Sequence, residues 1–201
     1  MIPFLLLIAA YIIGAIPFGH LIVKLTTGGD VRAMGSGNIG ATNVWRTTSR
    51  LAGIVTLLLD IAKGYFAVWL MARFTNGSPI WESAAALAVM AGHAYPVFLG
   101  FKGGKAVASC TGAFLYIDPL AMAAVAIIFV IVVAVTRYIS AGSIIGAGSL
   151  PFGIWLISHP PLPVLVSAFV AAAFIIWRHE ANIIRLRGGT ESVFSFTGGR
   201  K

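Results

Sequence analysis

Long apolar stretches separated by short polar turns follow one another along the whole chain. A helix that crosses a membrane needs about 20 apolar residues, with a usual range of ~17–25. The pattern therefore predicts an all-α polytopic membrane bundle of about seven spans, over residues 3–25, 51–74, 81–100, 106–117, 120–135, 141–158 and 162–177. The fourth stretch covers only about 18 Å at ~1.5 Å per residue, so we expect a short, tilted or locally thinned span there.

The composition supports lipid surroundings. Hydrophobic residues make up 59% of the chain and charged residues 10%, with a mean hydropathy of +0.94. Because a soluble domain carries roughly 25% charged residues, this chain could not cover a water-exposed surface. The first stretch has no charged segment before it and exceeds the apolar part of a signal peptide, so it is expected to stay as the first span. No linker separates folded domains, which predicts a single transmembrane domain over 1–201.

The charges are unequal in sign and in predicted side. Fourteen Lys and Arg face six Asp and Glu, and the cations are scattered, which disfavours a nucleic-acid partner. With seven spans and the loop 26–50 inside, the N-terminus lies outside and the C-terminus is cytoplasmic. All Lys and Arg then lie on the cytoplasmic side except Arg73, which is outside, and Lys63, which is within a span. A re-entrant fourth stretch would place 178–201 outside instead. The cations predicted to be cytoplasmic are Lys24, Arg32, Arg46, Arg50, Lys102, Lys105, Arg137, Arg178, Arg185, Arg187, Arg200 and Lys201.

The metal-ligating residue types are sparse. One cysteine, Cys110, excludes an intramolecular disulfide framework, and the four histidines lie far apart in the sequence. No Cys/His or Asp/His cluster has the spacing of a metal site. We therefore expect no metal and no cofactor.

Polar residues gather in three predicted cytoplasmic segments, of which the first is 30–46. Gly35 to Gly40 fits G-x-G-x-x-G, but a dinucleotide site also needs a strand before it and a βαβ unit, which a membrane helix does not supply. The segment is still suited to bind an anion, because its glycines let the backbone turn N–H groups outward and its short side chains add donors. These donors are Ser36, Asn38, Thr42, Asn43 and the bidentate Arg46. The alternative is an ordinary polar turn.

The second segment, 92–106, resembles a phosphate loop only in part. It is not a Walker A motif, because Leu99 replaces the first glycine and Ala106 the Ser/Thr. Gly103 and Gly104 are predicted to begin a helix, whose N-terminal N–H groups favour a phosphate. Lys102 and Lys105 add cations, and the alternative is a cationic turn flanking the membrane. His93 by itself is more typical of a hydrogen-bonded interior histidine than of a base.

The third segment, 178–191, has helical spacing that places His179, Asn182 and Arg185 near one another. A basic helix that binds anionic lipid is the alternative, although it would not need His179 or Asn182. Outside the three segments, Asp60 and Lys63 lie one helical turn apart near mid-membrane. They predict either a neutralising ion pair facing the bundle interior or a substrate role.

Together the three segments resemble the PlsY family, the bacterial acyl-phosphate:glycerol-3-phosphate acyltransferases. The similar residues are Gly35 to Asn38, Asn43 and Arg46; Gly92, His93 and Phe101 to Lys105; and His179, Asn182, Ile183, Arg185, Leu186, Gly189 and Glu191. Segments 11–21 and 60–64 are similar as well, so the resemblance runs from about Tyr11 to Glu191. The departures, Ala94-Tyr95 and Ser109, carry no charge.

The resemblance implies transfer of an acyl group from acyl phosphate to glycerol 3-phosphate, giving lysophosphatidic acid, at the cytoplasmic face of the bacterial inner membrane. Membrane lipid is the remaining partner, and no obligate protein partner is expected. By this resemblance the catalytic residues are Ser36, Arg46, Lys105, His179 and Asn182. The substrate-binding residues are Gly37, Asn38, Gly40, Thr42, Asn43, His93, Lys102, Gly103, Gly104, Ser143, Arg185 and Glu191.

Two questions stay open on the sequence. No His-x-x-x-x-Asp acyltransferase box is present, so either His179 or the substrate's own phosphate takes the hydroxyl proton, and the phosphate is slightly favoured. A transporter or channel for a phosphorylated solute is the alternative function, although it predicts polar residues at midplane in two repeated halves. A lipid-binding scaffold without chemistry is the third reading.

Overall fold

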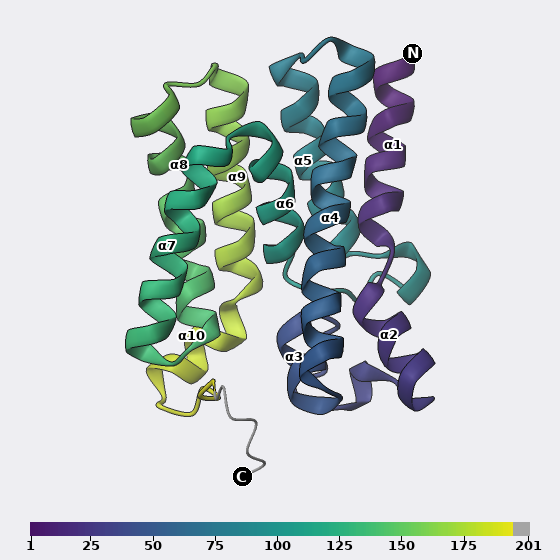
Figure 1. Cartoon of the computed structure of the whole chain (residues 1–201), viewed down its shortest axis with the longest axis vertical. Coiled ribbons are helices and arrows are strands. Elements are labelled where there is room, and N and C mark those ends of the chain that lie inside the picture. The colour runs from purple at the N-terminus through teal and green to yellow at the C-terminus, as the bar shows by residue number, and fades with distance from the viewer. Residues whose placement is uncertain (195–201) are drawn as a thin grey trace. The chain divides into compact units, whose positions relative to one another are not determined.

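The computed structural model describes residues 1–194, and all regular secondary structure in that range is helical (Figure 1). Arg200 and Lys201, which the charge analysis places in the cytoplasm, lie outside the described residues. The first compact unit, 1–116, holds α1 (Ile2–Ala15), α2 (Phe18–Thr27), η1 (Val31–Ala33), α3 (Ala41–Thr47), α4 (Arg50–Thr75), α5 (Pro79–Ala94), η2 (Val97–Leu99) and α6 (Val107–Ile117). The second unit begins at residue 117 and holds α7 (Pro119–Thr136), α8 (Ile139–Ser158), α9 (Leu162–Arg178) and α10 (Glu180–Arg187). The all-α prediction is confirmed.

Within residues 1–194, four segments are long and apolar enough to cross a membrane by themselves: Ile2–Thr27, Arg50–Thr75, Pro119–Thr136 and Ile139–Ser158. The pair α9 and α10, bent by 57°, makes a fifth if it is counted as one broken span. The stretch expected over 81–100 is helical only to Ala94, because Pro96 disfavours helical backbone in the residue before it. Residues 97–99 form a short 3₁₀ turn that ends at Gly100, with φ +61°. At 16 and 11 residues, α5 and α6 are shorter than the about 20 residues of a typical span.

The first apolar stretch is broken in the middle rather than continuous. Ile16 is extended (ψ 114°) between α1 and α2, as expected for the residue before Pro17. The Nζ of Lys63 on α4 donates to the Ile16 carbonyl at 2.9 Å. The break therefore turns a backbone acceptor toward a buried cation.

Close helix packing in the first unit depends on glycine. In Figure 1, α1 lies beside α4 and α5, and a Cβ on Gly14 of α1 would overlap the backbone of Val89 on α5. Where α4 meets α6, Gly64 and Gly112 each leave the same kind of room for the backbone of the facing helix. Small residues at such crossings are typical of membrane helices, because apolar helices in lipid associate through close van der Waals contact.

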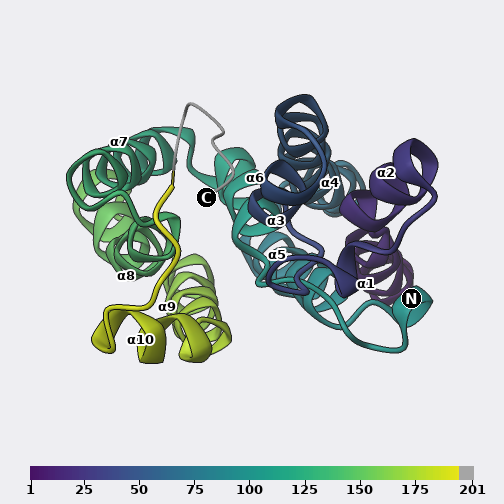
Figure 2. The same cartoon turned by 90° about the horizontal axis from the view of Figure 1, so that it is seen from below.

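The second unit packs in chain order, with α7 on α8 and α8 on α9. Beyond α10 the chain returns across the ends of α8 and α7 (Figure 2). Two hydrogen bonds hold it there: the Phe194 N–H donates to the Arg137 carbonyl at 2.7 Å, and the Arg137 Nε donates to the Phe194 carbonyl at 3.3 Å. The segment that carries Glu191 is thus tied to the turn between α7 and α8.

Candidate active site

The loop between α2 and α3, residues 30–40, is anchored by apolar side chains. Val31 and Ile39 in the loop pack in one buried cluster with Val23 of α2, Val44 of α3 and Ala52 of α4. This anchoring fixes both ends of the loop and leaves its polar tip outward. Ser36 and Gly37 at the tip are exposed, and so is Arg46 in the last turn of α3.

Asn43 organises this loop from inside. Its side chain is 3% exposed, and its Oδ1 accepts a hydrogen bond from the Ser36 N–H at 3.0 Å. Its Nδ2 donates to the carbonyls of Val31, Met34 and Asn38 at 3.2, 3.0 and 2.8 Å. Asn43 is one of the substrate donors expected from the sequence. In the structure its amide instead binds the loop backbone, so we expect it to act through the shape of the loop.

The backbone N–H groups of the loop tip bond within the loop as well. Gly37 donates to the Met34 carbonyl, and Gly40 donates to the Asn38 Oδ1 at 2.8 Å. Gly35 and Gly37 have φ of +55° and +71°, and a Cβ on Gly35 would overlap the Asn43 amide. The glycines thus let the loop close on Asn43. The expectation that these N–H groups point toward an anion does not hold for Ser36, Gly37 and Gly40.

The start of the loop carries an ion pair. Asp30 caps η1 and accepts from the Nε and the Nη2 of Arg32, the latter at 2.6 Å, while the His20 Nδ1 lies 3.2 Å from its Oδ1. The side-chain hydrogen bond from Arg32 holds the pKa of Asp30 well below its usual range. The folded state therefore favours the ionised Asp30 carboxylate, and its contact with His20 links the loop to α2.

The second segment turns back on the end of α5. The Gly103 N–H donates to the Ala94 carbonyl and the Gly104 N–H to the His93 carbonyl, both at 3.1 Å. α6 begins only at Val107, so the prediction that Gly103 and Gly104 begin a helix is wrong, and their N–H groups are used inside the protein. A Cβ on Gly104 would overlap the His93 ring. Glycine is required there because imidazole and backbone are in direct contact.

His93 is an interior histidine, as its sequence context suggests. It is 4% exposed, and its Nδ1 lies 3.2 Å from the Ser109 Oγ and 3.6 Å from the Asp60 Oδ1. A serine–histidine–aspartate relay needs the serine on one ring nitrogen and the carboxylate on the other. Because both oxygens face Nδ1, this cluster cannot act as such a relay, and Ser109 is not a candidate nucleophile.

In the second unit, the polar residues of α10 converge on Glu191. Its Oε1 accepts from the Asn182 Nδ2 at 2.8 Å and from the Ser140 Oγ at 3.0 Å, and its Oε2 accepts from the Arg185 Nε at 2.7 Å. Partial burial alone would raise the pKa of this carboxyl, but the three hydrogen bonds outweigh it and lower the pKa. The ionised Glu191 carboxylate thus orients Asn182 and Arg185 through hydrogen bonds.

His179 lies at the bend between α9 and α10, ahead of the α10 residues. It is 3% exposed, and its Nδ1 bonds to the Ile175 carbonyl at 2.8 Å. A carbonyl can only accept, so Nδ1 carries a proton. In the neutral ring the lone pair is then on Nε2, as a general base requires. Ser143 on α8 is buried, and its hydroxyl donates to the Ile139 carbonyl at 3.0 Å.

The expected site residues therefore form three bonded groups. Loop 30–40 joins Ser36, Asn38, Gly40 and Asn43; the end of α5 binds Gly104 through His93 and Gly103 through Ala94; and Glu191 joins Asn182 and Arg185. Thr42 lies in the first turn of α3, Lys102 is exposed beyond η2, and Lys105 lies two residues before the start of α6. Ser140 was missed, and no sequence signal marks it, since its role depends on Glu191 reaching it from 51 positions away.

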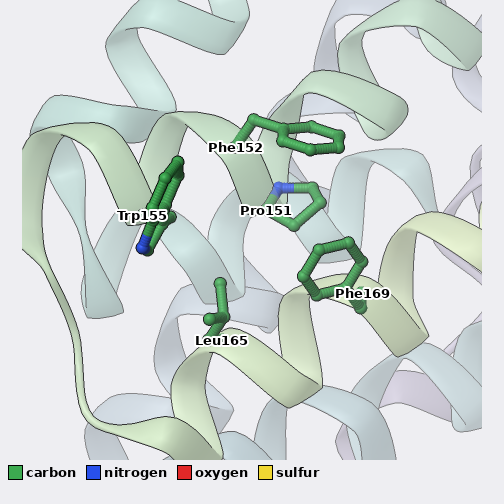
Figure 3. Close-up of a pocket in the computed structure, with 5 residues that line it drawn as sticks. All are labelled: Pro151, Phe152, Trp155, Leu165 and Phe169. Atoms are coloured by element: carbon green, nitrogen blue, oxygen red, sulfur yellow. The ribbon is translucent and has the colours of Figure 1, made fainter.

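The second unit also carries an apolar groove. Figure 3 shows its lining, which is made by Pro151, Phe152 and Trp155 of α8 and by Leu165 and Phe169 of α9. The volume of the groove is about 280 Å³. Phe169 precedes His179 by ten residues, or about 15 Å of helix at ~1.5 Å per residue. The groove contains none of the expected polar residues.

Comparison with known proteins decides the family. The family model described as glycerol-3-phosphate acyltransferase matches residues 4–189, across both units. The chain belongs to the glycerol-3-phosphate acyltransferase family. Curated members from Geobacter sulfurreducens and Desulforamulus reducens are 48% and 45% identical, over 92% and 93% of this chain and 94% and 92% of their own. The resemblance read from the three segments is thereby confirmed.

Two solved structures share the fold. They are crystal structures of PlsY, described as an integral membrane glycerol 3-phosphate acyltransferase, in a glycerol 3-phosphate form and a lysophosphatidic acid form. Their TM-scores are 0.92 and 0.89, at 36% and 35% identity, and each match covers 98% of both chains. The acyltransferase family fold is therefore that of a multi-pass integral membrane protein.

Proposed function

We propose that this protein transfers an acyl group from acyl phosphate to glycerol 3-phosphate and releases lysophosphatidic acid and inorganic phosphate. Membership of the glycerol-3-phosphate acyltransferase family carries the proposal. Two PlsY structures of the same fold were solved with the acceptor and with the product. Acyl phosphate fits as the donor because it is a mixed anhydride with a good leaving group. No cofactor is then needed to activate the acyl carbon.

The first unit supplies the groups for the acyl-phosphate head. We assign it to the loop tip at Ser36, Gly37, Asn38 and Gly40 and to the segment at Gly103 and Gly104. Several backbone N–H groups of these two segments already bond within the protein. The Ser36 hydroxyl therefore supplies the polar contact with the acyl-phosphate head, and the fixed backbone shape of the two turns supplies the steric fit. Charged donors at Arg46 and Lys105 bind the second phosphate, that of glycerol 3-phosphate, since charge-assisted hydrogen bonds to phosphate are the strong ones.

The second unit supplies the groups around the attacking hydroxyl. Asn182, held by Glu191, grips glycerol 3-phosphate together with His179, and Ser143 is a weaker candidate contact. The hydroxyl oxygen attacks the acyl carbon, the bond from that carbon to the phosphate oxygen breaks, and inorganic phosphate leaves. The hydroxyl proton passes either to the His179 Nε2 or to the departing phosphate. We favour the phosphate as the proton acceptor. Positioning of two bound reactants supplies most of the acceleration.

The same proposal includes the topology. We assign seven crossings to the chain, with α5 and α6 as short spans, the N-terminus outside and the C-terminus in the cytoplasm. The strongest support is the distribution of cations: with this topology, twelve of the fourteen Lys and Arg fall on the cytoplasmic side and only Arg73 falls outside. The active site then faces the cytoplasm of a bacterial cell. The two units act as one acyltransferase domain, with no obligate protein partner.

A donor assay tests the proposed function. Purified protein is given radiolabelled glycerol 3-phosphate with palmitoyl phosphate, palmitoyl-CoA or palmitoyl carrier protein in separate reactions. We expect lysophosphatidic acid only with palmitoyl phosphate. Product that requires the thioester donors would overturn the choice of donor. Uptake of glycerol 3-phosphate into liposomes without acylation would favour the transporter alternative.

Replacing His179 distinguishes the two proton acceptors. If the histidine is the base, His179→Ala lowers kcat by about 10²-fold at saturating substrate, since general base catalysis contributes typically 10²–10⁴-fold. If the leaving phosphate takes the proton, as we favour, KM for glycerol 3-phosphate rises about tenfold and kcat at saturation is retained. Initial rates over a matrix of both substrate concentrations separate these results. His159→Ala, in the turn between α8 and α9, is the matched control.

A further inference from the structure

Asp60 and Lys63 lie buried in the middle of α4, and the catalytic roles above use neither of them. They are 2% and 5% exposed, and the Lys63 Nζ lies 2.7 Å from the Asp60 Oδ1. A buried pair of this kind can simply neutralise itself. Each ion, however, makes a further contact on another helix, and neutralisation does not require either contact.

The contact of Lys63 is with the broken first span. Its Nζ donates to the Ile16 carbonyl at 2.9 Å and lies 5.6 Å from the centre of the Phe18 ring. These residues flank the break, so Lys63 fixes where α2 begins. α2 in turn supports the loop 30–40: Gly19 lies against the Ile39 backbone, and Val23 belongs to the cluster that anchors the loop.

The contact of Asp60 is with the second segment. Its Oδ1 lies 3.6 Å from the Nδ1 of His93, whose ring occupies the space next to Gly104. The His93 carbonyl accepts from the Gly104 N–H, so side chain and backbone of one histidine both shape this turn. Lys105 follows directly.

We propose that Asp60 and Lys63 are positioning residues that hold the two phosphate-binding segments of the first unit in register. Lys63 acts on loop 30–40 through the α1–α2 break, and Asp60 acts on residues 103–105 through His93. The pair touches no substrate. The inference rests on the proposed assignment of the acyl-phosphate head to these two segments.

The double variant Asp60→Asn/Lys63→Met separates positioning from neutralisation. Each single variant leaves one buried charge unpaired and is expected to lower the Tm. The double variant contains no unpaired charge, so its Tm returns close to that of the wild type. It lacks the ammonium that binds Ile16 and the carboxylate that faces His93, so KM for acyl phosphate is expected to stay raised about tenfold. Wild-type kinetics in the double variant would overturn the proposal.

Thr56→Val is the matched control, because Thr56 is fully buried one turn earlier on α4 and its hydroxyl bonds only within the helix, to the Ala52 carbonyl. Loss of this buried hydroxyl is expected to leave KM for acyl phosphate at the wild-type value. A rise equal to that of the double variant would show that any buried polar change on α4 has the same effect, and it would overturn the specific role of the pair.

Limited trypsin digestion gives a readout that does not depend on activity. Arg32 and Lys102 are exposed cleavage sites in the two positioned segments, and Arg187 in the second unit is an exposed internal reference. We expect the double variant to be cut several-fold faster at Arg32 and Lys102 relative to Arg187. An unchanged ratio would overturn the proposal. A changed ratio in a protein whose wild type shows no acyl transfer would support positioning while refuting the proposed function.

Discussion

Replacing Asn43 with alanine is expected to lower kcat/KM by about 10³-fold and the free energy of unfolding by about 4 kcal/mol. The side chain makes four hydrogen bonds to the loop backbone, and a typical bond contributes roughly 0.5–1.5 kcal/mol net. Without them the tip at Ser36 loses its shape, and a displacement of about 1 Å at a reacting group can cost about 10²-fold. Steady-state kinetics and chemical denaturation in detergent measure the two effects.

Asn43→Asp makes this prediction sharper. The carboxylate is the same shape and still accepts from the Ser36 N–H, but it faces three carbonyl oxygens to which it cannot donate. We therefore expect Asn43→Asp to be no more active than Asn43→Ala. Thr47→Val is the control, since it removes a hydroxyl that bonds to the Asn43 carbonyl on the same short helix. Full stability of Asn43→Ala together with lost activity would mean that Asn43 contacts substrate directly.

The sequence could not distinguish the loop residues that bind substrate from those that hold the loop in shape. Glycines, short donors and an arginine predicted an anion loop, and the segment is a glycine-containing loop anchored between α2 and α3. Which donors point outward depends on hydrogen bonds across the loop. The Asn43 amide spans up to 12 positions to reach Val31, and local pattern does not encode that choice.

Helix boundaries show a similar division. Hydropathy located the apolar segments, because burial in lipid requires a minimum length of apolar chain. It did not predict the break at Ile16, although Pro17 was a local signal for it. The late start of α6 at Val107 had no such signal. Residues 103–104 stay outside the helix because their N–H groups pair with carbonyls at the end of α5, a tertiary interaction.

The pair Asp60 and Lys63 was expected to be a neutralising ion pair facing the bundle interior or to have a substrate role. Both side chains are indeed buried and paired. Spacing on one helix could not reveal the contacts with Ile16 on the first span or with His93 on α5. Those contacts connect residues 47 and 33 positions apart, and only the packing of α1, α4 and α5 creates them.

Glu191→Ala is expected to have an effect as large as Asn43→Ala, in the second unit. The substitution leaves Asn182, Arg185 and Ser140 without the carboxylate that orients them. The side chain of Glu191 is only 6% exposed, so water cannot easily replace it. Hydrogen bonds to a charged group contribute about 1.5–3 kcal/mol each, partly offset here by water at Arg185. We expect a loss of about 3 kcal/mol in the free energy of unfolding and about 10³-fold in kcat/KM, with KM for glycerol 3-phosphate rising.

Acid should reproduce part of this effect without a mutation. The pKa of Glu191 is lower in the folded protein than its ordinary value of 4.5, so the folded state prefers the ionised carboxylate. This contribution to stability is complete above pH 4.5 and is lost as pH falls through the folded pKa. The Tm difference between wild type and Glu191→Gln should therefore be large at pH 7 and should shrink as pH falls below 4.5. Glu180→Gln removes an exposed carboxylate at the start of α10 and is the control, with the wild-type Tm expected at pH 7. A Glu191→Gln protein with wild-type Tm and KM at pH 7 would show that the Glu191 carboxylate does not orient Asn182 and Arg185.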